Sequence, residues 1–393
     1  IFLTVKMIHV HFLKTSNLGK TVGDFNGSGQ IDGLDYAIWL KYFSGPTSTP
    51  LPTGSRGGVS PVKIATGAYP ALAADKNGDA HIVYAANGKL MYKKYTASTG
   101  SFSAEEDTGI TQNASYRNDP AIVIDSQNRP HVLGGTGNDG GQYAYWNGSS
   151  WMKVGTFNRD TGIAIDNFDN VYIAERGDLV NFIKVYKRTS GAASFIQLTN
   201  PFVSAQNDHV YTDIYTSPTD NSVHIVYRHG VSPNICGYTY STNGGSSWTN
   251  LGITADDTEA PSGVVAKDGT VYSVCGNGTV FQRSGTTGWT NLGRAVNALT
   301  RYLPVMSSDS NSKIYVSSFG GKYNIRKSSS WVGERVVSGL TTQSKGFMRL
   351  VGAGNFAYAV WEEGNNNAVL DTQTASFDLV FATINSSGVV GFD

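Results

Sequence analysis

A two-strand pattern recurs seven times between residue 69 and the C-terminus of this chain. In each copy a short apolar segment ends in a polar turn, often at Asp, and a second segment rich in Val, Ile and Tyr follows. The copies begin 41 to 50 residues apart, at Tyr69, Asp119, Thr161, Tyr211, Pro261, Tyr302 and Phe347. This period is typical of β-propeller blades, because one small twisted sheet cannot bury both faces and needs neighbouring copies to cover them. We therefore expect an all-β fold, a seven-bladed β-propeller over residues 59–393. The ring could close by pairing the C-terminal run 377–384 with an early strand such as residues 59–64.

The composition agrees with an all-β protein that has many tight turns. Only 15% of the residues are charged, while the chain holds 46 Gly and 21 Tyr, a balance typical of secreted proteins. Lys and Arg number 30, as do Asp and Glu, so no net charge attracts nucleic acid or an anionic membrane. No apolar run is long enough to span a bilayer. We expect an extracellular or cell-surface protein of a bacterium or archaeon.

The chain has two cysteines, Cys236 and Cys275. Two buried thiols and one disulfide between neighbouring repeats are both compatible with this number. Neither the count nor the spacing indicates a disulfide scaffold or a Cys/His metal site.

Residues 24–35 have the spacing of a calcium-binding loop, with oxygen-bearing side chains at alternate positions and Gly29 at the sharp turn. Calcium prefers six to eight oxygen ligands. The expected ligands are Asp24, Asn26, Ser28, the main-chain carbonyl of Gln30, Asp32 through a water molecule, and Asp35. A helix-like run, residues 36–43, follows the loop directly.

The sequence GDFNGSGQIDGLDYAIWL, with Asp35 where an EF-hand has Glu, resembles the dockerin repeat of secreted bacterial proteins. Dockerins carry two such repeats and bind a cohesin partner. Because this chain offers one repeat, the resemblance implies a structural calcium site more than a cohesin-binding module.

Three segments precede the propeller. Residues 1–22 begin with an apolar run rich in β-branched side chains, which predicts a strand that must pair within its own chain or with another copy. Residues 23–45 form the dockerin-like repeat. Residues 46–58 are rich in Pro, Thr and Gly and predict a linker.

Residues 240–248, YSTNGGSSW, resemble the Asp-box of bacterial neuraminidase-repeat propellers, the sialidase-like superfamily, with Asn243 in place of the usual Asp. This resemblance implies a turn that joins the third and fourth strands of a blade. It therefore concerns architecture, not catalysis.

Propeller ligands bind at the mouth of the central channel, near the residues that precede the first strand of each repeat. The expected ligand-binding residues are Tyr116, Arg117, Arg301 and Tyr302, and Lys345 precedes the seventh repeat. Such a ring would suit an anionic sugar, because Arg pairs with a carboxylate or sulfate and Tyr stacks on the sugar.

The chain also resembles polysaccharide lyases of the ulvan-lyase kind, which are seven-bladed and use His and Tyr as base and acid beside an Arg that neutralises the uronate carboxylate. This resemblance implies the catalytic candidates His131, His209, Tyr211, Arg228 and His229. His131, however, shares its repeat position with His81 and His224. This recurrence favours a role in packing for all three histidines. A sialidase would need an arginine triad and an early Arg-Ile-Pro, which the sequence does not supply.

Three functions stay open. The first is a propeller that binds a glycan or a protein and carries a structural calcium ion. The second is a polysaccharide lyase that acts on a uronic-acid polysaccharide. The third is a self-assembling surface or filament protein that docks through residues 1–22.

Overall fold

The computed structural model describes twelve ranges of the chain. They are residues 58–112, 119–136, 140–158, 161–176, 183–201, 209–229, 235–252, 261–284, 288–297, 304–364, 377–385 and 387–391. The chain divides into two compact units, Ile1–Gly54 and Ser55–Asp393. The predicted N-terminal strand, calcium loop and most of the linker therefore lie outside the described residues.

Each of the seven sequence repeats becomes an antiparallel hairpin. The first repeat contains β1 (Val62–Ala74), β2 (Ala80–Ala86), β3 (Lys89–Thr96), β4 (Ser101–Phe102) and β5 (Glu106–Thr111). The second contains β6 (Ala121–Ile124), β7 (Pro130–Thr136), β8 (Gly140–Trp146) and β9 (Trp151–Phe157). The third contains β10 (Gly162–Ile165), β11 (Val171–Arg176), β12 (Ile183–Arg188) and β13 (Ile196–Gln197). The aromatic third strands expected at residues 90–95 and 142–146 are confirmed as parts of β3 and β8.

The remaining repeats follow the same order of strands. The fourth contains β14 (His209–Thr216), β15 (Val223–His229), β16 (Ile235–Ser241) and β17 (Thr249–Asn250). The fifth contains β18 (Ser262–Val265), β19 (Val271–Val274), β20 (Thr279–Ser284) and β21 (Gly288–Arg294). The sixth contains β22 (Val305–Ser308), β23 (Ile314–Ser318), η1 (Phe319–Gly321), β24 (Lys322–Lys327), β25 (Ser330–Trp331) and β26 (Arg335–Val336). The seventh contains β27 (Ser344–Ala353), β28 (Phe356–Gly364) and β29 (Phe377–Asn385).

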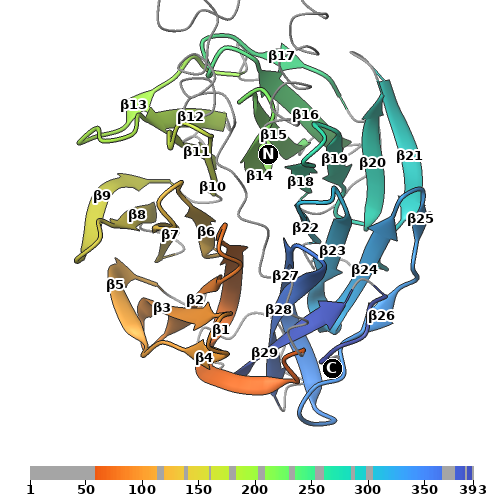
Figure 1. Cartoon of the computed structure of the whole chain (residues 1–393). Coiled ribbons are helices and arrows are strands. Elements are labelled where there is room, and N and C mark those ends of the chain that lie inside the picture. The colour runs from red at the N-terminus through yellow and green to blue at the C-terminus, as the bar shows by residue number, and fades with distance from the viewer. Residues whose placement is uncertain are drawn as a thin grey trace, which may run out of the picture. The chain divides into compact units, whose positions relative to one another are not determined.

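The sheets stand in a ring, and the first strand of each repeat lies nearest the axis (Figure 1). Four sheets have four strands, one has five, and one has eight. Within the described residues the only helical element is the short 3-10 turn η1, so no described helix could cross a membrane. The fold is therefore all-β, as the sequence predicts.

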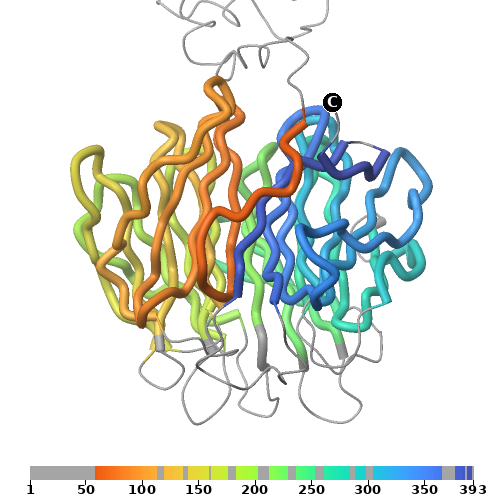
Figure 2. Tube along the Cα trace, turned by 90° about the horizontal axis from the view of Figure 1, so that it is seen from below, coloured from red at the N-terminus to blue at the C-terminus, as the bar shows by residue number. Residues whose placement is uncertain are grey.

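The eight-stranded sheet joins the first repeat to the last. The first half of β1 pairs with β29, for example Val62 with Phe381, and after a bulge the second half pairs with β2. Val59 adds hydrogen bonds to Thr383 in both directions. Figure 2 shows this N-terminal strand, in orange, beside the blue C-terminal strand. The expected closure of the ring by the two ends of the repeat region is confirmed.

The core lies between neighbouring sheets, where apolar side chains of two successive repeats form one cluster. Leu133 of β7, for example, packs with Ile163 of β10 and Ile173 of β11. The clusters in the described part of the chain connect every consecutive pair of repeats and also the seventh repeat with the first. Each sheet thus buries both faces only because it has two neighbours.

Cys236 and Cys275 form a disulfide that joins β16 of the fourth repeat to the end of β19 in the fifth. Of the two interpretations that the sequence allowed, the bridge between neighbouring repeats is the one found.

The Asp-box-like segment forms the expected turn between β16 and β17. Ser241 Oγ accepts a hydrogen bond from Gly245 N at 2.8 Å, and the Asn243 side chain accepts one from Ser247 N at 2.9 Å. The Trp248 indole donates to Thr199 O in the neighbouring repeat. This arrangement is structural, as the resemblance implied.

Candidate functional site

A cavity of about 440 Å³ lies where the innermost strands begin. Every repeat contributes to its wall, through residues such as Ala71, Asp119, Gly162, Asp213, Ser262 and Arg349. A volume of this size is within the usual range for pockets that bind small molecules or sugar units. The cavity occupies the expected position, beside the residues that precede the first strand of each repeat.

Arg349 and Asp119 form an ion pair in the cavity wall. Arg349 Nη2 in β27 lies 3.1 Å from Asp119 Oδ2, just before β6, so the pair links the seventh and second repeats. Only about a tenth of the Arg349 side chain is exposed. Its guanidinium also donates to the Met348 carbonyl and lies 5.8 Å from the centre of the Phe347 ring. The guanidinium is therefore held in one place at the cavity surface.

A series of hydrogen bonds links three repeats on the wall of the cavity. Ser262 Oγ of β18 donates to Asp213 Oδ2 of β14 at 2.8 Å and accepts from Met306 N of β22 at 3.2 Å. Gly263 N also donates to Asp213. Burial raises the pKa of Asp213 above its ordinary value, although these hydrogen bonds and the Arg349 charge oppose the shift.

Glu362 of β28 is buried close to the same ion pair. Its two carboxyl oxygens accept hydrogen bonds from Tyr69 N at 2.6 Å and Phe347 N at 3.1 Å. Burial raises the pKa of Glu362 to about 7, and the negative charge of Asp119 adds to this rise. Three carboxyl groups therefore surround one guanidinium, and two of them have raised pKa values.

An alignment of the repeats would have drawn attention to this site. One position is equivalent in all seven repeats, four residues before the first residue of the turn. It is occupied by Ala71, Ala121, Gly162, Asp213, Ser262, Val305 and Arg349. Five of these side chains are small or apolar and two are charged. Since this position faces the axis of the ring, the charges at Asp213 and Arg349 mark the cavity, and neither residue is among the site residues predicted from the sequence.

The predicted ligand-binding residues Tyr116, Arg117, Arg301 and Tyr302 lie outside the described residues. Lys345 is described, but its ammonium group forms an ion pair with Glu363 at 3.1 Å and its side chain is largely buried. This pairing assigns Lys345 to the packing of the seventh repeat and not to the cavity wall.

The β14–β15 hairpin brings the other lyase candidates together along the backbone. His209 pairs with His229, Val210 pairs with Arg228, and Tyr211 lies at the bulge that follows. The next residues, Thr212 and Asp213, line the cavity. His209, Tyr211, Arg228 and His229 therefore share one end of one hairpin, the end beside the cavity.

His131 has a different position from these four residues. It is buried between the second and third repeats, with Nδ1 2.6 Å from the Tyr143 hydroxyl and Nε2 3.4 Å from Asp125. The structure thus gives His131 a packing role away from the cavity, which corrects its inclusion among the catalytic candidates.

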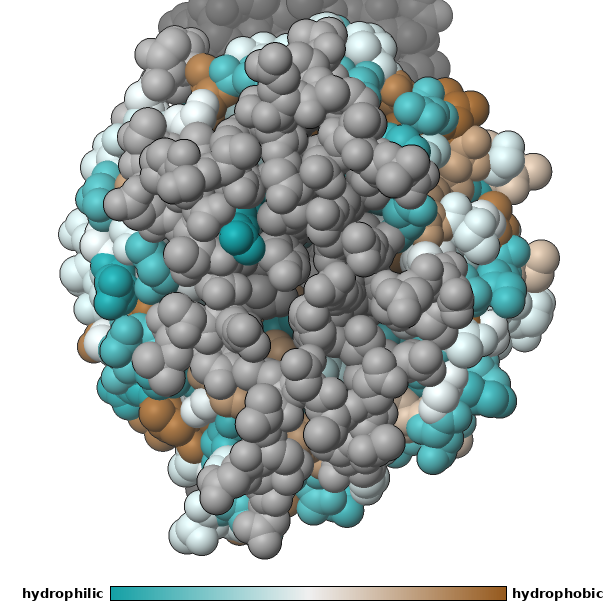
Figure 3. All heavy atoms as spheres, turned by 180° about the vertical axis from the view of Figure 1, so that it is seen from behind, coloured by the Kyte–Doolittle hydropathy of each residue, from teal (hydrophilic) through white to brown (hydrophobic). Residues whose placement is uncertain are grey.

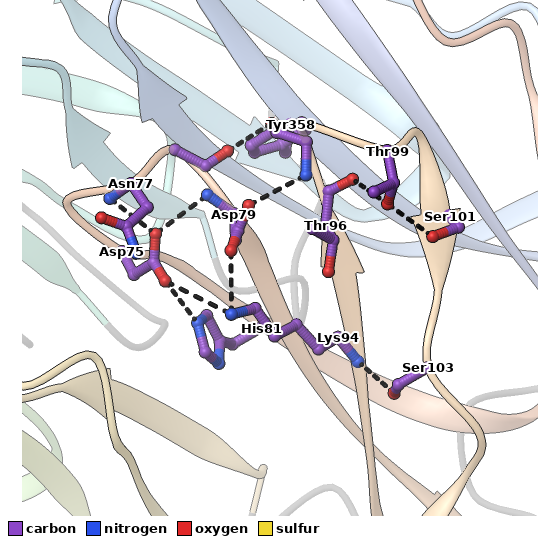
Figure 4. A network of polar contacts seen from close by, with 12 residues as sticks. Asp75, Asn77, Asp79, His81, Lys94, Thr96, Thr99, Ser101, Ser103 and Tyr358 are labelled. Carbon is purple, nitrogen blue, oxygen red and sulfur yellow. Dashed lines mark hydrogen bonds and ion pairs between the residues drawn. The ribbon is translucent and has the colours of Figure 1, made fainter. Parts of the chain in front are cut away.

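The same contacts recur at the other two histidines of this repeat position. In the first repeat, His81 Nε2 lies 3.2 Å from Asp75 Oδ2 (Figure 4), and His81 Nδ1 lies 2.8 Å from the Tyr92 hydroxyl. His224 lies between Ser222 and Tyr238 in the fourth repeat, and burial lowers its pKa to about 3. The packing interpretation of these three histidines is therefore confirmed.

The exposed hydrophobic side chains of the described residues are spread over several sheets and turns. Viewed from behind Figure 1, hydrophilic and hydrophobic residues alternate around the periphery (Figure 3). Exposed hydrophobic side chains such as Met152, Phe168, Ile196 and Val336 belong to different sheets and turns. We therefore take the cavity as the candidate functional site.

No protein-family model matches the sequence, and no curated protein matches it. Solved structures do match the fold. The polysaccharide lyase Uly1 is 9% identical, with a TM-score of 0.54 over 80% of this chain and 89% of its own. A PL25 ulvan lyase bound to -[GlcA(1-4)Rha3S]- is 10% identical, with a TM-score of 0.51 over 86% of this chain and 96% of its own. A sialidase from Trypanosoma rangeli is 11% identical, with a TM-score of 0.45 over 74% of this chain and 57% of its own. The fold is a β-propeller. At these identities the likeness extends to the fold alone.

Proposed function

We propose that this chain is an extracellular or cell-surface propeller of seven blades that binds a glycan in its central cavity. The Arg349–Asp119 ion pair in the cavity wall is the observation that carries this proposal. A guanidinium offers only hydrogen-bond donors and a carboxylate only acceptors, whereas a sugar hydroxyl can do both. The pair is thus complementary to neighbouring hydroxyl groups of one sugar ring.

Two features support the count of seven blades. The eight-stranded sheet contains strands from the first and last repeats, which are joined only by the pairing of β29 with β1. Divided at that pairing, the sheets number seven, one for each sequence repeat. The hydrophobic clusters follow the same division, because each connects one repeat with the next.

The apolar part of the cavity wall supports a glycan as well. Leu72, Ile122 and Ile163 line it together with the polar residues. A pocket with mostly apolar walls and a few placed polar groups can pack against the C–H face of a sugar while it binds the hydroxyls. Two polysaccharide lyases with this fold match it with TM-scores above 0.5, and one of them is bound to -[GlcA(1-4)Rha3S]-.

A glycan array tests this proposal with the full chain and two double variants. Asp119→Asn with Arg349→Gln removes the ion pair without changing the net charge, and we expect binding to fall at least tenfold, since each charged hydrogen bond contributes about 1.5–3 kcal/mol. Lys89→Gln with Asp107→Asn removes an exposed ion pair elsewhere and should leave binding unchanged. If no glycan binds, or if both variants behave alike, the proposal is wrong.

Catalysis by a polysaccharide lyase is the second candidate, favoured by the backbone register of β14 and β15. His209, Tyr211, Arg228 and His229 share one hairpin end, and they are the residue types that proton abstraction beside a carboxylate requires. Incubation with uronic-acid polysaccharides should then produce unsaturated ends that absorb ultraviolet light. Tyr211→Phe should remove this activity while glycan binding remains. Absence of the chromophore with every uronic-acid polysaccharide would exclude the lyase.

We further propose a calcium ion at Asp24, Asn26, Ser28, Gln30, Asp32 and Asp35. The spacing of these oxygen ligands supports the site. Calorimetric titration of the full chain with calcium should show one site, and Asp24→Ala with Asp35→Ala should weaken it at least tenfold. Unchanged calcium affinity in the double variant would contradict the proposal.

Self-association through residues 1–22 is the remaining proposal, and the unpaired strand that the sequence predicts there supports it. The mass in solution of the full chain, compared with that of a version without residues 1–22, tests it. A large full-length species and a monomeric truncated one are expected. Two monomers would exclude assembly through this segment.

A further inference from the structure

We propose that the central cavity takes an uncharged sugar unit and discriminates against acidic sugars, and that Asp119 sets this selectivity by occupying Arg349. This inference rests on the proposed glycan binding and specifies the class of ligand. It is opposite to the expectation of an anionic sugar that the basic residues near the repeat starts suggested, and it is incompatible with the second candidate function, a lyase that acts on uronic-acid polysaccharides.

The described residues of the cavity wall include no positive charge without a partner for an acidic sugar. Among the described residues that line it, Arg349 is the one cation, and its Nη2 already lies 3.1 Å from Asp119 Oδ2. An incoming carboxylate or sulfate would have to displace Asp119 and leave that carboxylate partly buried without its counter-ion. Separating such a pair is costly, because the remaining charge loses its partner where water reaches it poorly.

The neighbouring carboxyl groups make an acidic ligand still less favourable. Asp213 lines the cavity and Glu362 lies close enough to Arg349 and Asp119 to interact electrostatically with both. Arg349 and Asp119 cancel each other, so the group of four carries zero charge when Asp213 and Glu362 are protonated and two negative charges when both are ionised. The group is therefore never positive while Asp119 is ionised.

An uncharged sugar meets none of these penalties. Its hydroxyls can donate to Asp119 and accept from Arg349 while the ion pair stays intact. Its C–H faces can pack on the apolar part of the wall at Leu72, Ile122 and Ile163. The intact ion pair then binds hydroxyl groups and disfavours the binding of anions.

Two single substitutions that change the net charge by the same amount separate this selectivity from a general charge effect. Asp119→Asn leaves a side chain of the same size but frees Arg349, whereas Asp107→Asn removes an exposed carboxylate that pairs with Lys89. The full-length protein and both variants are compared on an array that carries neutral glycans and uronic-acid glycans.

We expect the wild-type protein to bind neutral glycans at least tenfold more tightly than acidic ones, and Asp119→Asn to gain about tenfold in affinity for uronic-acid glycans. The Asp107→Asn protein should bind like the wild type. Thermal melting shows whether Asp119→Asn is folded, and the wild-type preference is decisive even if that variant is not.

The outcomes also distinguish this inference from the proposed function. Tighter wild-type binding to acidic than to neutral glycans would overturn the selectivity and leave glycan binding intact. Equal responses of Asp119→Asn and Asp107→Asn would overturn the role of Asp119. Binding to no glycan of either class would overturn both the inference and the proposed function.

Discussion

Buried or partly buried carboxyl groups lie near both ends of the innermost strands, and their surroundings shift the pKa values in opposite directions at the two ends. At the turn end, hydrogen bonds lower the pKa of Asp75 and of Asp125, although burial opposes the shift. At the cavity end, burial raises the pKa of Asp213 and of Glu362. The same chemical group therefore has a different role at each end of the ring.

The turn end satisfies its carboxylates almost completely. Asp125 accepts hydrogen bonds from the main-chain N–H groups of Gln127 and Arg129, from the Arg129 guanidinium, and from the nearby His131 ring. Together these contacts lower its pKa to about 2 in spite of burial. Asp75 has the same arrangement in the first repeat (Figure 4). An Asp in this position therefore stabilises the turn.

The cavity end keeps its carboxyl groups at an energetic cost. Asp213 is partly buried in the cavity wall and Glu362 is buried near the Asp119 carboxylate, and the hydrogen bonds that each accepts do not fully compensate for the loss of water. Buried groups with raised pKa values are more frequent at functional sites than in packing regions. The comparison thus separates residues that hold the ring together from residues that give the cavity its chemistry.

Removal of a turn-end carboxylate is the change with the largest expected effect. Asp125→Ala should lower the free energy of unfolding by about 4 kcal/mol, because it leaves main-chain donors and the Arg129 guanidinium without their acceptor. Chemical denaturation measures this loss.

Asp213→Asn is the matched variant at the cavity end. Its amide oxygen can still accept from Ser262 Oγ and Gly263 N, and the ionised form is already disfavoured, so we expect a loss below about 1 kcal/mol. Similar losses for Asp125→Ala and Asp213→Asn would contradict the division between the two ends.

Removal of the disulfide tests how the cavity end is held together. Cys236 pairs with Arg228 along the strands, and Cys275 directly follows Val274, the partner of Ser262. The cross-link therefore lies at the cavity end of the fourth and fifth repeats. With a sequence separation of 39 between the cysteines, its removal should cost about 3–4 kcal/mol through the entropy of the unfolded chain.

Cys236→Ser with Cys275→Ser, measured by thermal melting beside the reduced wild-type protein, gives this value. The double variant and the reduced protein should be destabilised to a similar degree. A melting temperature unchanged in both would show that the cavity end needs no covalent bridge.

A pH series distinguishes the two ends by the sign of the effect. The pKa of Glu362 rises from 4.5 to about 7 on folding, so the folded protein binds this proton more tightly than the unfolded chain. Its stabilising contribution is complete below about pH 4.5 and is lost as the pH rises through 7, by roughly 3 kcal/mol. The pKa of Asp125 is lowered to about 2, so its contribution is present above about pH 4 and is lost as the pH falls toward 2.

Glu362→Gln provides the control for this series. The free energy of unfolding of the variant should fall less between about pH 5 and pH 8 than that of the wild type. Identical pH profiles of the two proteins would mean that Glu362 does not titrate in this range.

The sequence predicted the architecture because the physical causes of the fold are local and repeated. The turn residues illustrate this, since Gly78, Asn128, Asp169 and Asn221 all have positive φ at equivalent positions, and these residue types tolerate that conformation. The closure of the ring was also predictable, because the apolar run at residues 377–384 needs a strand beside it.

The cavity was less accessible to prediction from the sequence. Arg349 and Asp119 are 230 residues apart, and no local pattern indicates that two such residues meet. The expected site residues were instead taken from the segments between repeats, most of which lie outside the described residues. The charged side chains that do line the cavity come largely from the strands themselves, where a charge interrupts an otherwise apolar position.

The smallest expected effect concerns the hydrogen bonds that link neighbouring turns. The Asp169 carboxylate accepts from Ser126 N at 2.7 Å and from Ser126 Oγ at 2.6 Å, and Asp169 has a φ of 60°. Both groups are exposed, so the two hydrogen bonds together contribute about 1 kcal/mol.

Asp169→Gly loses these two hydrogen bonds but relieves a backbone conformation that costs a non-glycine residue about 1 kcal/mol. The net change in the free energy of unfolding should therefore stay below about 0.5 kcal/mol. Asp169→Ala loses the bonds and keeps the strain, so urea denaturation should place it about 1 kcal/mol below Asp169→Gly. If the two variants are equally stable, the positive φ is not what selects the turn residue, and the turn end depends on its buried carboxylates alone.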